Sequence, residues 1–171
     1  ADSWVEGEGS YRDIHDAVNG QVIAQVSTAG LDLGAALAHA RDVGGPNLRA
    51  MTFAERGAIL KQLSRVVVDA RDELLALSCQ NYGATRRDGK FDVDGASGTL
   101  SYYAYLGKQL GQRTFLLDGE AENILSSKRF IGQHMLFSRR GVAVHINAFN
   151  FPCWGMAEKL ATAILAGMPV F

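Results

Sequence analysis

Residues 142–155, VAVHINAFNFPCWG, constrain the fold more than any other part of this 171-residue chain. Five largely apolar residues, 142–146, predict a buried strand that stops at polar Asn147. A short turn follows, and Pro152 then opens a helix, at a position where a backbone N–H would have no partner within the helix. α/β proteins hold anions and cofactors where a strand runs directly into a helix N-terminus. We therefore interpret the remaining residues as a scaffold for this turn.

The composition is that of an ordinary globular domain, with 47% hydrophobic and 20% charged residues. The net charge of −1 gives no overall attraction to nucleic acid or to an anionic membrane. The longest apolar run, residues 160–171, is too short to span a bilayer and is interrupted by Thr162, Gly167 and Pro169. We therefore predict neither a nucleic-acid partner nor a membrane partner.

Cysteine usage indicates a reducing compartment. Cys79 and Cys153 lie far apart, and neither belongs to a CxxC motif or to a zinc-ligand spacing. The polar, acidic N-terminal residues 1–13 do not resemble a signal peptide. The sequence thus predicts free thiols, no metal site and a cytoplasmic location.

The first 125 residues predict a hairpin followed by helices. Asn19-Gly20 is a strong turn signal within residues 1–30. A helix capped by Asp32 should end at Gly44-Gly45-Pro46, and Thr52 with Glu55 forms a capping box for a long helix that reaches about residue 81. We expect loops at 86–90 and 112–122, and a third helix over 92–110.

The C-terminal part reads as an extended arm followed by one βαβ unit. Residues 126–140 are β-prone and lie outside the main βα pattern, so they could pair with another subunit as an oligomerisation arm. Residues 141–171 read as strand, turn, helix, Gly167 and the start of a second strand. A parallel sheet needs more strands, so we expect the chain to be a fragment of a larger α/β protein.

Asn150 is the candidate catalytic residue of the turn. Its side-chain amide would sit at a helix N-terminus, where it could stabilise charge that develops on a carbonyl oxygen. The alternative is that Asn150 only caps the helix. Cys153 also lies near this helix N-terminus, which stabilises a thiolate, but bulky Phe151 and Trp154 favour a packed thiol.

The turn resembles the Pro-Trp-Asn-Phe-Pro segment of the aldehyde dehydrogenase superfamily, with Ala148-Phe149 in place of Pro-Trp and with Asn150-Phe151-Pro152 kept. The string VAVHINAFNFPCWGMAEKL is more similar still to the branch found in aerobic phenylacetate and benzoate degradation, which includes enzymes that oxidise CoA-linked semialdehydes. LRAMTFAER at 48–56, GATR at 83–86, DVDG at 92–95, GTL at 98–100 and VNGQVI at 18–23 resemble that branch too. The resemblance spans essentially the whole chain.

The resemblance implies the N-terminal part of an aldehyde dehydrogenase fold: hairpin and helices in 1–125, the arm in 126–140 and the start of a parallel, Rossmann-like sheet in 141–171. It implies that Asn150 is the oxyanion-hole asparagine. It assigns the cofactor-lining segment to Ile146, Asn147, Ala148 and Phe149, and the border of the aldehyde tunnel to Phe151 and Trp154. The family's catalytic cysteine, general-base glutamate and cofactor-binding lysine would lie beyond Phe171.

We therefore expect part of an NADP- or NAD-dependent aldehyde dehydrogenase that oxidises a semialdehyde, plausibly CoA-linked, to its acid. A thiolate would add to the aldehyde, hydride would pass to nicotinamide, and water would hydrolyse the thioester. We expect a homo-oligomer, and no turnover by the 171 residues alone. The alternatives are a CoA-acylating aldehyde dehydrogenase and a non-catalytic α/β assembly module.

Overall fold

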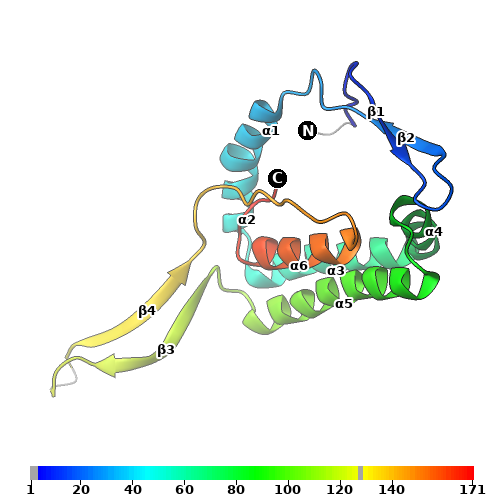
Figure 1. The fold of residues 1–171 in the computed structure, drawn as a ribbon. Coiled ribbons are helices and arrows are strands. Elements are labelled where there is room, and N and C mark those ends of the chain that lie inside the picture. Colours follow the sequence, from blue (N-terminus) through cyan, green and yellow to red (C-terminus); the bar gives the residue numbers. More distant parts are fainter. Residues whose placement is uncertain (1–3, 127–128) are drawn as a thin grey trace.

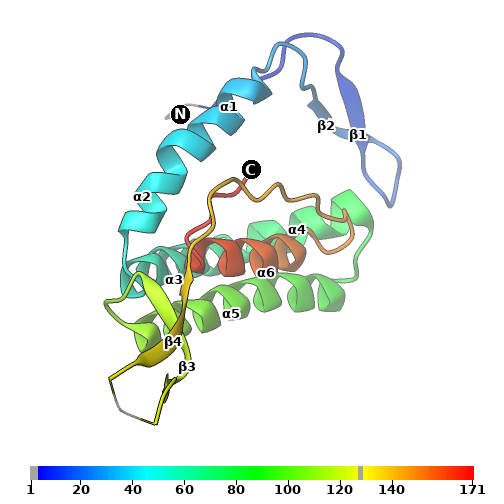
Figure 2. The same cartoon turned by 90° about the vertical axis from the view of Figure 1, so that its left-hand side faces the viewer.

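Three helices packed side by side form the body of the molecule in a computed structural model that describes residues 4–126 and 129–171 (Figures 1 and 2). They are α3 (Phe53–Asp69), α5 (Arg86–Leu110) and α6 (Pro152–Leu165), and α5 packs against both of the others. The flanking elements are β1 (Arg12–His15), β2 (Val22–Val26), α1 (Leu33–His39), the π-helical turn η1 (Ala40–Gly44), α2 (Gly45–Ala50), α4 (Arg71–Tyr82), β3 (Phe115–Asn123) and β4 (Ile131–Phe137).

Two glycines allow α3 and α5 to cross closely. A Cβ at Gly57 would lie 2.8 Å from the carbonyl oxygen of Ala104, and one at Gly107 would lie 2.6 Å from that of Phe53. The core is therefore compact, and small and large apolar side chains from the three helices fill it. Its buried members are Phe53, Leu60, Ala96, Leu100, Ala104, Ala157, Ala161 and Leu165.

The capping box predicted at the start of the long helix is confirmed. The Thr52 hydroxyl accepts a hydrogen bond from the Glu55 amide at 3.2 Å, and the Glu55 carboxylate accepts one from the Thr52 amide at 2.7 Å. The helix is shorter than predicted, however. It ends at Asp69, and Ala70, with ψ of 8°, separates it from α4, although the sequence has neither Gly nor Pro there.

The predicted end of the first helix at Gly44-Gly45-Pro46 is wrong. Gly44 and Gly45 keep helical φ values of −59° and −61°, and η1 carries the chain into α2. Pro46 lies in the first turn of α2, directly after the π-helical turn η1. The breaker residues therefore mark a change of helix type rather than a loop.

Two predicted loops are also wrong. Residues 86–90 belong to α5, because Thr85 caps it with Asp88 and because Gly89 permits close packing on Leu75 and Ser78 of α4. Residues 112–122 mostly form β3, which pairs antiparallel with β4 from Phe115↔Phe137 to Asn123↔Ile131. The arm predicted at 126–140 is thus the second strand of a hairpin, and residues 127–128 lie outside the described residues. Figure 1 shows this hairpin projecting well away from the helical body.

The βαβ start predicted at the C-terminus is present only as a single parallel bridge. The buried strand predicted at 142–146 is wrong, because none of these residues is buried and, among the described residues, no further strand covers or extends the bridge. Ala143 donates its amide to Pro169 at 2.8 Å, Phe171 donates to Ala143 at 2.8 Å, and His145 donates to Phe171 at 2.9 Å. These bonds make a parallel bridge between Ala143 and Val170 on either side of α6. Gly167, with φ of 78°, ends α6 as expected. None of the described helices is long and apolar enough to cross a membrane.

Arg56 of α3 holds the C-terminal ends of two other helices. It is fully buried, and its guanidinium donates to Leu48 at 2.8 Å and to Arg49 at 3.5 Å at the end of α2, and to Leu165 at 3.0 Å at the end of α6. Carbonyl groups in the last turn of a helix lack intrahelical partners and carry partial negative charge, so a cation there satisfies both needs. Burial lowers the pKa of Arg56, but a guanidinium stays protonated in proteins.

We expect Arg56→Met to lower the free energy of unfolding of the chain by about 3 kcal/mol, because it removes the donor to the buried Leu165 carbonyl oxygen and one of the two donors to that of Leu48. Urea denaturation followed by circular dichroism measures the change. Arg65→Met is the matched control, since Arg65 is exposed on the same helix and its loss should change stability by less than about 0.5 kcal/mol. Equal denaturation midpoints for the two variants would contradict this role of Arg56.

Candidate active site

The turn before α6 is exposed, and its asparagine amide is available. Residues 146–151 are all exposed, with Ile146 at 87% and Phe149 at 77%. The helix starts at Pro152 and its N-cap residue is Phe151, whose side chain makes no capping hydrogen bond. Within the described residues the Asn150 side chain makes no hydrogen bond. The structure therefore does not support the alternative that Asn150 is the helix cap.

Asp92 of α5 takes the capping role instead. It is fully buried, and its carboxylate accepts hydrogen bonds from the Trp154 amide at 2.7 Å and from the Cys153 amide at 3.2 Å. These are two of the amides at the N-terminus of α6 that have no partner within the helix. A carboxylate is also the charge that a helix N-terminus favours. The start of α6 is thereby fixed to α5, and with it the turn that carries Asn150.

Lys159 fixes the other side of the turn. Its ammonium donates to the Ile146 carbonyl oxygen at 3.1 Å and to Oδ1 of Asn147 at 2.8 Å. Lys159 lies two turns into α6, so these bonds tie the end of the strand segment back to the helix that follows. Lys159 therefore fixes the first two residues of the predicted cofactor-lining segment, whereas Ala148 and Phe149 are exposed and make no such bond to Lys159.

Cys153 is poorly suited to be a nucleophile. Burial, and then the neighbouring Asp92 carboxylate, raise its pKa from 9.0 to about 11. A thiolate is the reactive form of cysteine, so a raised pKa keeps the group in its unreactive form near neutral pH. The helix N-terminus that would have stabilised a thiolate already holds Asp92. The packed thiol predicted from the bulky neighbours agrees with this environment.

Trp154 is held rigidly by α5. Its indole Nε1 donates to the Thr99 hydroxyl at 3.0 Å, and its ring meets Phe91 edge to face with centroids 5.0 Å apart. The ring also covers Gly95, where a Cβ would lie only 2.7 Å from the indole. Trp154 is half-buried, whereas Phe151 is 39% exposed. Both predicted tunnel residues thus lie at the start of α6, beside Asn150.

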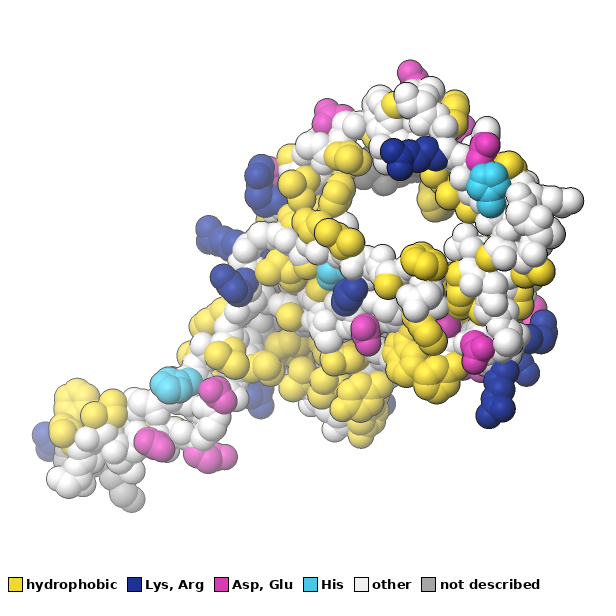
Figure 3. All heavy atoms as spheres, viewed as in Figure 1, with side chains coloured by type: hydrophobic (Ala, Val, Ile, Leu, Met, Phe, Trp, Pro, Cys, Tyr) yellow, Lys and Arg dark blue, Asp and Glu magenta, His cyan; other side chains and the backbone are white. Residues whose placement is uncertain are grey.

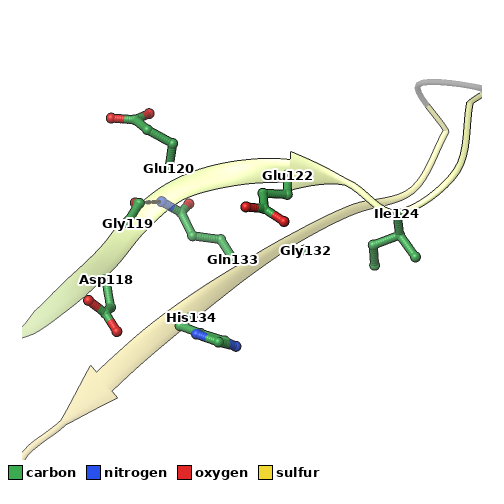
Figure 4. Close-up of a pocket in the computed structure, with 8 residues that line it drawn as sticks. All are labelled: Asp118, Gly119, Glu120, Glu122, Ile124, Gly132, Gln133 and His134. Carbon is green, nitrogen blue, oxygen red and sulfur yellow. Dashed lines mark hydrogen bonds between the residues drawn. The ribbon is translucent and has the colours of Figure 1, made fainter.

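A cavity of about 340 Å³ at the start of α6 is lined in part by Pro152 and Cys153. A larger cavity, of about 620 Å³, lies on the arm (Figure 4). It opens where the register of β3 and β4 shifts between Asp118 and Glu122, and Gln133 closes one side by donating to the Gly119 carbonyl oxygen at 3.0 Å. Figure 4 shows acidic side chains of β3 and His134 of β4 around it. All of its walls come from the hairpin, so it contributes nothing to the Asn150 turn.

The sequence reasoning missed Asp92 and Lys159 as parts of this site. Asp92 acts across 61 residues of sequence, and no local pattern announces such a contact. An acidic residue in the middle of a helix that is otherwise apolar on that side, next to Val93 and Ala96, was the available signal. Lys159 stands seven residues after Pro152 and reads as an ordinary helix-surface lysine.

Similarity to known proteins identifies the family of this chain. A family model described as "Aldehyde dehydrogenase family" matches residues 4–171. A 3,4-dehydroadipyl-CoA semialdehyde dehydrogenase from Aromatoleum evansii is 45% identical over 168 residues, which are 98% of this chain and 33% of that protein. A D-glyceraldehyde dehydrogenase (NADP(+)) from Thermoplasma acidophilum is 29% identical over 98% of this chain and 32% of its own length. The chain therefore spans about a third of the length of these relatives.

Solved structures show the same fold. An NAD-dependent benzaldehyde dehydrogenase from Corynebacterium glutamicum superposes with a TM-score of 0.79 at 21% identity, over 98% of this chain and 35% of that one. Lactaldehyde dehydrogenase from Escherichia coli superposes with a TM-score of 0.77 at 24% identity, over 95% and 32%. Together with the match over residues 4–171, these likenesses show that the chain belongs to the aldehyde dehydrogenase family.

Proposed function

We propose that this chain is part of an NAD(P)-dependent aldehyde dehydrogenase that oxidises a CoA-linked semialdehyde to its acid. The 45% identity to a CoA-semialdehyde dehydrogenase over 98% of the chain supports the substrate class. The observation that carries the chemistry is the exposed Asn150 amide beside a helix N-terminus whose own amides bond to Asp92. A donor that the fold does not use is available for a substrate oxygen.

In this proposal, Asn150 stabilises the oxygen of the substrate. When a thiolate adds to the aldehyde carbon, the carbonyl oxygen becomes an alkoxide, and the Asn150 N–H donates to it. The same donor polarises the carbonyl oxygen of the acyl-enzyme when water attacks, and the acid is released. In this proposal the nucleophilic thiolate comes from outside these 171 residues, since the raised pKa of Cys153 keeps it a thiol.

The segment from Ile146 to Phe149 fits the nicotinamide cofactor that the family implies. Its large apolar side chains are exposed, which suits contact with a planar ring, and Lys159 fixes its backbone. The cofactor would accept a hydride from the substrate. The family relatives whose names include NADP(+) or NAD leave the choice between the two dinucleotides open.

Exposed apolar side chains border an opening in the molecule that we propose the remainder of the enzyme fills. Figure 3 shows these side chains around the opening between the helical body, α1 and the β1–β2 hairpin. Val144 is 59% exposed on the strand segment, which already pairs in parallel with Val170 on one side. Parallel sheets are covered on both faces and require further strands, so this segment suits the interior of a larger sheet.

We further propose that the β3–β4 hairpin assembles copies of the enzyme. It projects away from the helical body in Figure 1, and an isolated two-stranded hairpin is at best marginally stable in water. Its exposed apolar residues include Leu117, Met135 and Phe137. The unpaired edges of the two strands can extend a sheet of a second copy.

The two free thiols, Cys79 and Cys153, support the cytoplasmic location expected from the sequence.

Asn150→Ala in the full-length enzyme should lower kcat by about 10²–10³, because one donor to the developing alkoxide is lost. The KM for the aldehyde should change little, since the interaction strengthens in the transition state. Steady-state assay of NAD(P)H formation measures both constants. Asn47→Ala, an exposed asparagine on α2, is the matched control and should behave as wild type. A kcat for Asn150→Ala within twofold of wild type would overturn the assignment.

Cys153 in the native protein should react slowly with iodoacetamide at pH 9.0, where a thiol of ordinary pKa would be half ionised. With its pKa at about 11, the thiolate fraction and hence the rate should fall about fiftyfold relative to the unfolded chain. In the 171-residue chain the Cys79→Ala background leaves Cys153 as the one thiol, and mass spectrometry follows its modification. Equal rates in native and urea-unfolded protein would show a reactive Cys153.

Charges on the apolar side of the arm should dissociate the assembly. Leu117 and Met135 face each other across the hairpin, so Leu117→Lys with Met135→Lys places two charges there. Asp118→Lys with His134→Lys is the matched control, because this neighbouring pair points to the opposite side. Light scattering after size-exclusion chromatography should show a lower mass for the first variant alone. An unchanged mass for it would remove the arm from the interface.

A further inference from the structure

We propose that the start of α5, with Phe91, Arg87 and Lys90, forms an entrance subsite for the nucleotide part of CoA, whose adenine and phosphates lie far from the reacting aldehyde. This inference rests on the proposed function and goes further by naming the residues that bind the CoA nucleotide of the substrate. The argument begins at Trp154, which borders the same turn as Asn150 and is fixed by Gly95, Thr99 and Phe91.

Phe91 is a large aromatic side chain that lies mostly in solvent and so contributes little to the core. It is 63% exposed, although its neighbours Asp92 and Val93 are almost completely buried. One edge contacts the Trp154 indole at 74° between the ring planes, so the pair presents an aromatic surface to solvent beside the start of α6. Aromatic surfaces of this kind stack against nucleobases, and the stacking depends little on sequence or partner.

Basic side chains stand next to this aromatic surface. Arg87 precedes Phe91 by four residues on α5, which places both on one side of the helix. Lys90 directly precedes Phe91 and projects about 100° around the helix from it. Arg87 and Lys90 are both exposed. Figure 3 shows Lys and Arg side chains gathered at this end of the molecule, at the lower right, near a large hydrophobic patch.

The acidic side chains nearby are already engaged. Asp88 bonds to the Thr85 hydroxyl at 2.7 Å as part of the helix cap. Asp94 receives two bonds from Arg71 at 2.6 and 2.8 Å, and Lys90 adds to the field that lowers the pKa of Asp94.

The remaining base at this end, Arg86, has an acidic partner of its own. Arg86 donates to Asp72 at 3.3 Å. In the described residues, by contrast, neither Arg87 nor Lys90 has a carboxylate within ion-pair distance. Two cations beside an aromatic surface therefore remain to meet an anionic ligand.

This donor set matches the 3′-phosphoadenosine diphosphate group of CoA. Phosphate oxygens suit a guanidinium and an ammonium, and the adenine suits the exposed ring of Phe91. The position matches as well, because Asp92 follows Phe91 in sequence and bonds directly to the first amides of α6. The nucleotide would therefore bind outside the tunnel that Trp154 borders, with the acyl arm reaching inward to Asn150.

The test compares two substrates of the full-length enzyme with the same semialdehyde group, one as its CoA thioester and one as its N-acetylcysteamine thioester, which lacks the nucleotide. Arg87→Glu with Lys90→Glu should raise KM for the CoA thioester about tenfold or more, and leave kcat and the constants for the short thioester and for NAD(P) unchanged. Phe91→Leu, which keeps an apolar contact with Trp154, should raise the same KM about fivefold. Raising the salt concentration should weaken CoA-thioester binding in wild type and not in the charge variant.

Arg65→Glu with Lys108→Glu is the matched control, because it makes the same charge change at exposed sites on α3 and at the far end of α5. Equal effects of the two charge variants would overturn the subsite. So would a loss shared equally by both thioesters, or a higher KM for NAD(P) in the Arg87 and Lys90 variant, which would assign these bases to the cofactor. If wild type oxidises neither thioester, the proposed function fails with the subsite. If it oxidises both with the same KM, only the subsite fails.

Discussion

Two buried side chains of opposite charge hold α6 at its two ends, and the rest of the structure depends on this arrangement. The Asp92 carboxylate binds the first amides of the helix, and the Arg56 guanidinium binds its last carbonyl oxygen. Each charge complements the helix dipole at its end. Because Asp92 belongs to α5 and Arg56 to α3, the packing of these two helices at Gly57 and Gly107 fixes where α6 begins and ends. The turn before α6 inherits its position from a core that it does not itself enter.

This division of roles explains how the turn can be exposed and still well placed. The residue before a helix usually caps it, and the side chain of an asparagine at that point would then bond to the backbone amides of the first turn. Here Asp92 satisfies the helix from outside, and Lys159 satisfies the strand end at Ile146 and Asn147. Asn150 therefore contributes little to folding, and its side-chain amide stays available. The same arrangement affects Cys153, whose pKa rises first because the thiol is buried and further because the carboxylate that caps the helix is its neighbour.

Signals that act within a few residues could be read from the sequence. The Thr52 capping box, Pro152 at the start of α6 and Gly167 after its end were all predicted and are all present. The predictions were wrong where a residue type fits both a loop and a helix. Gly89 reads as a loop residue but permits contact with α4, and Pro46 reads as a stop but fits the first turn of α2. The bond between Arg56 and Leu165 could not be predicted from the sequence, because the two residues are 109 positions apart and an arginine within a helix usually faces solvent.

Burying Arg56 and Asp92 has an energetic cost that stability alone does not justify, since apolar replacements often serve a core as well. What a buried charge supplies is a fixed geometry, because its hydrogen bonds are satisfied in one arrangement of the helices and broken in others. At Asp92 that geometry includes the first turn of α6, the indole of Trp154 and the neighbouring Phe91. A single carboxylate thus sets the spacing between the Asn150 amide and the aromatic surface at the start of α5. The distance between these two exposed groups is therefore a property of the core.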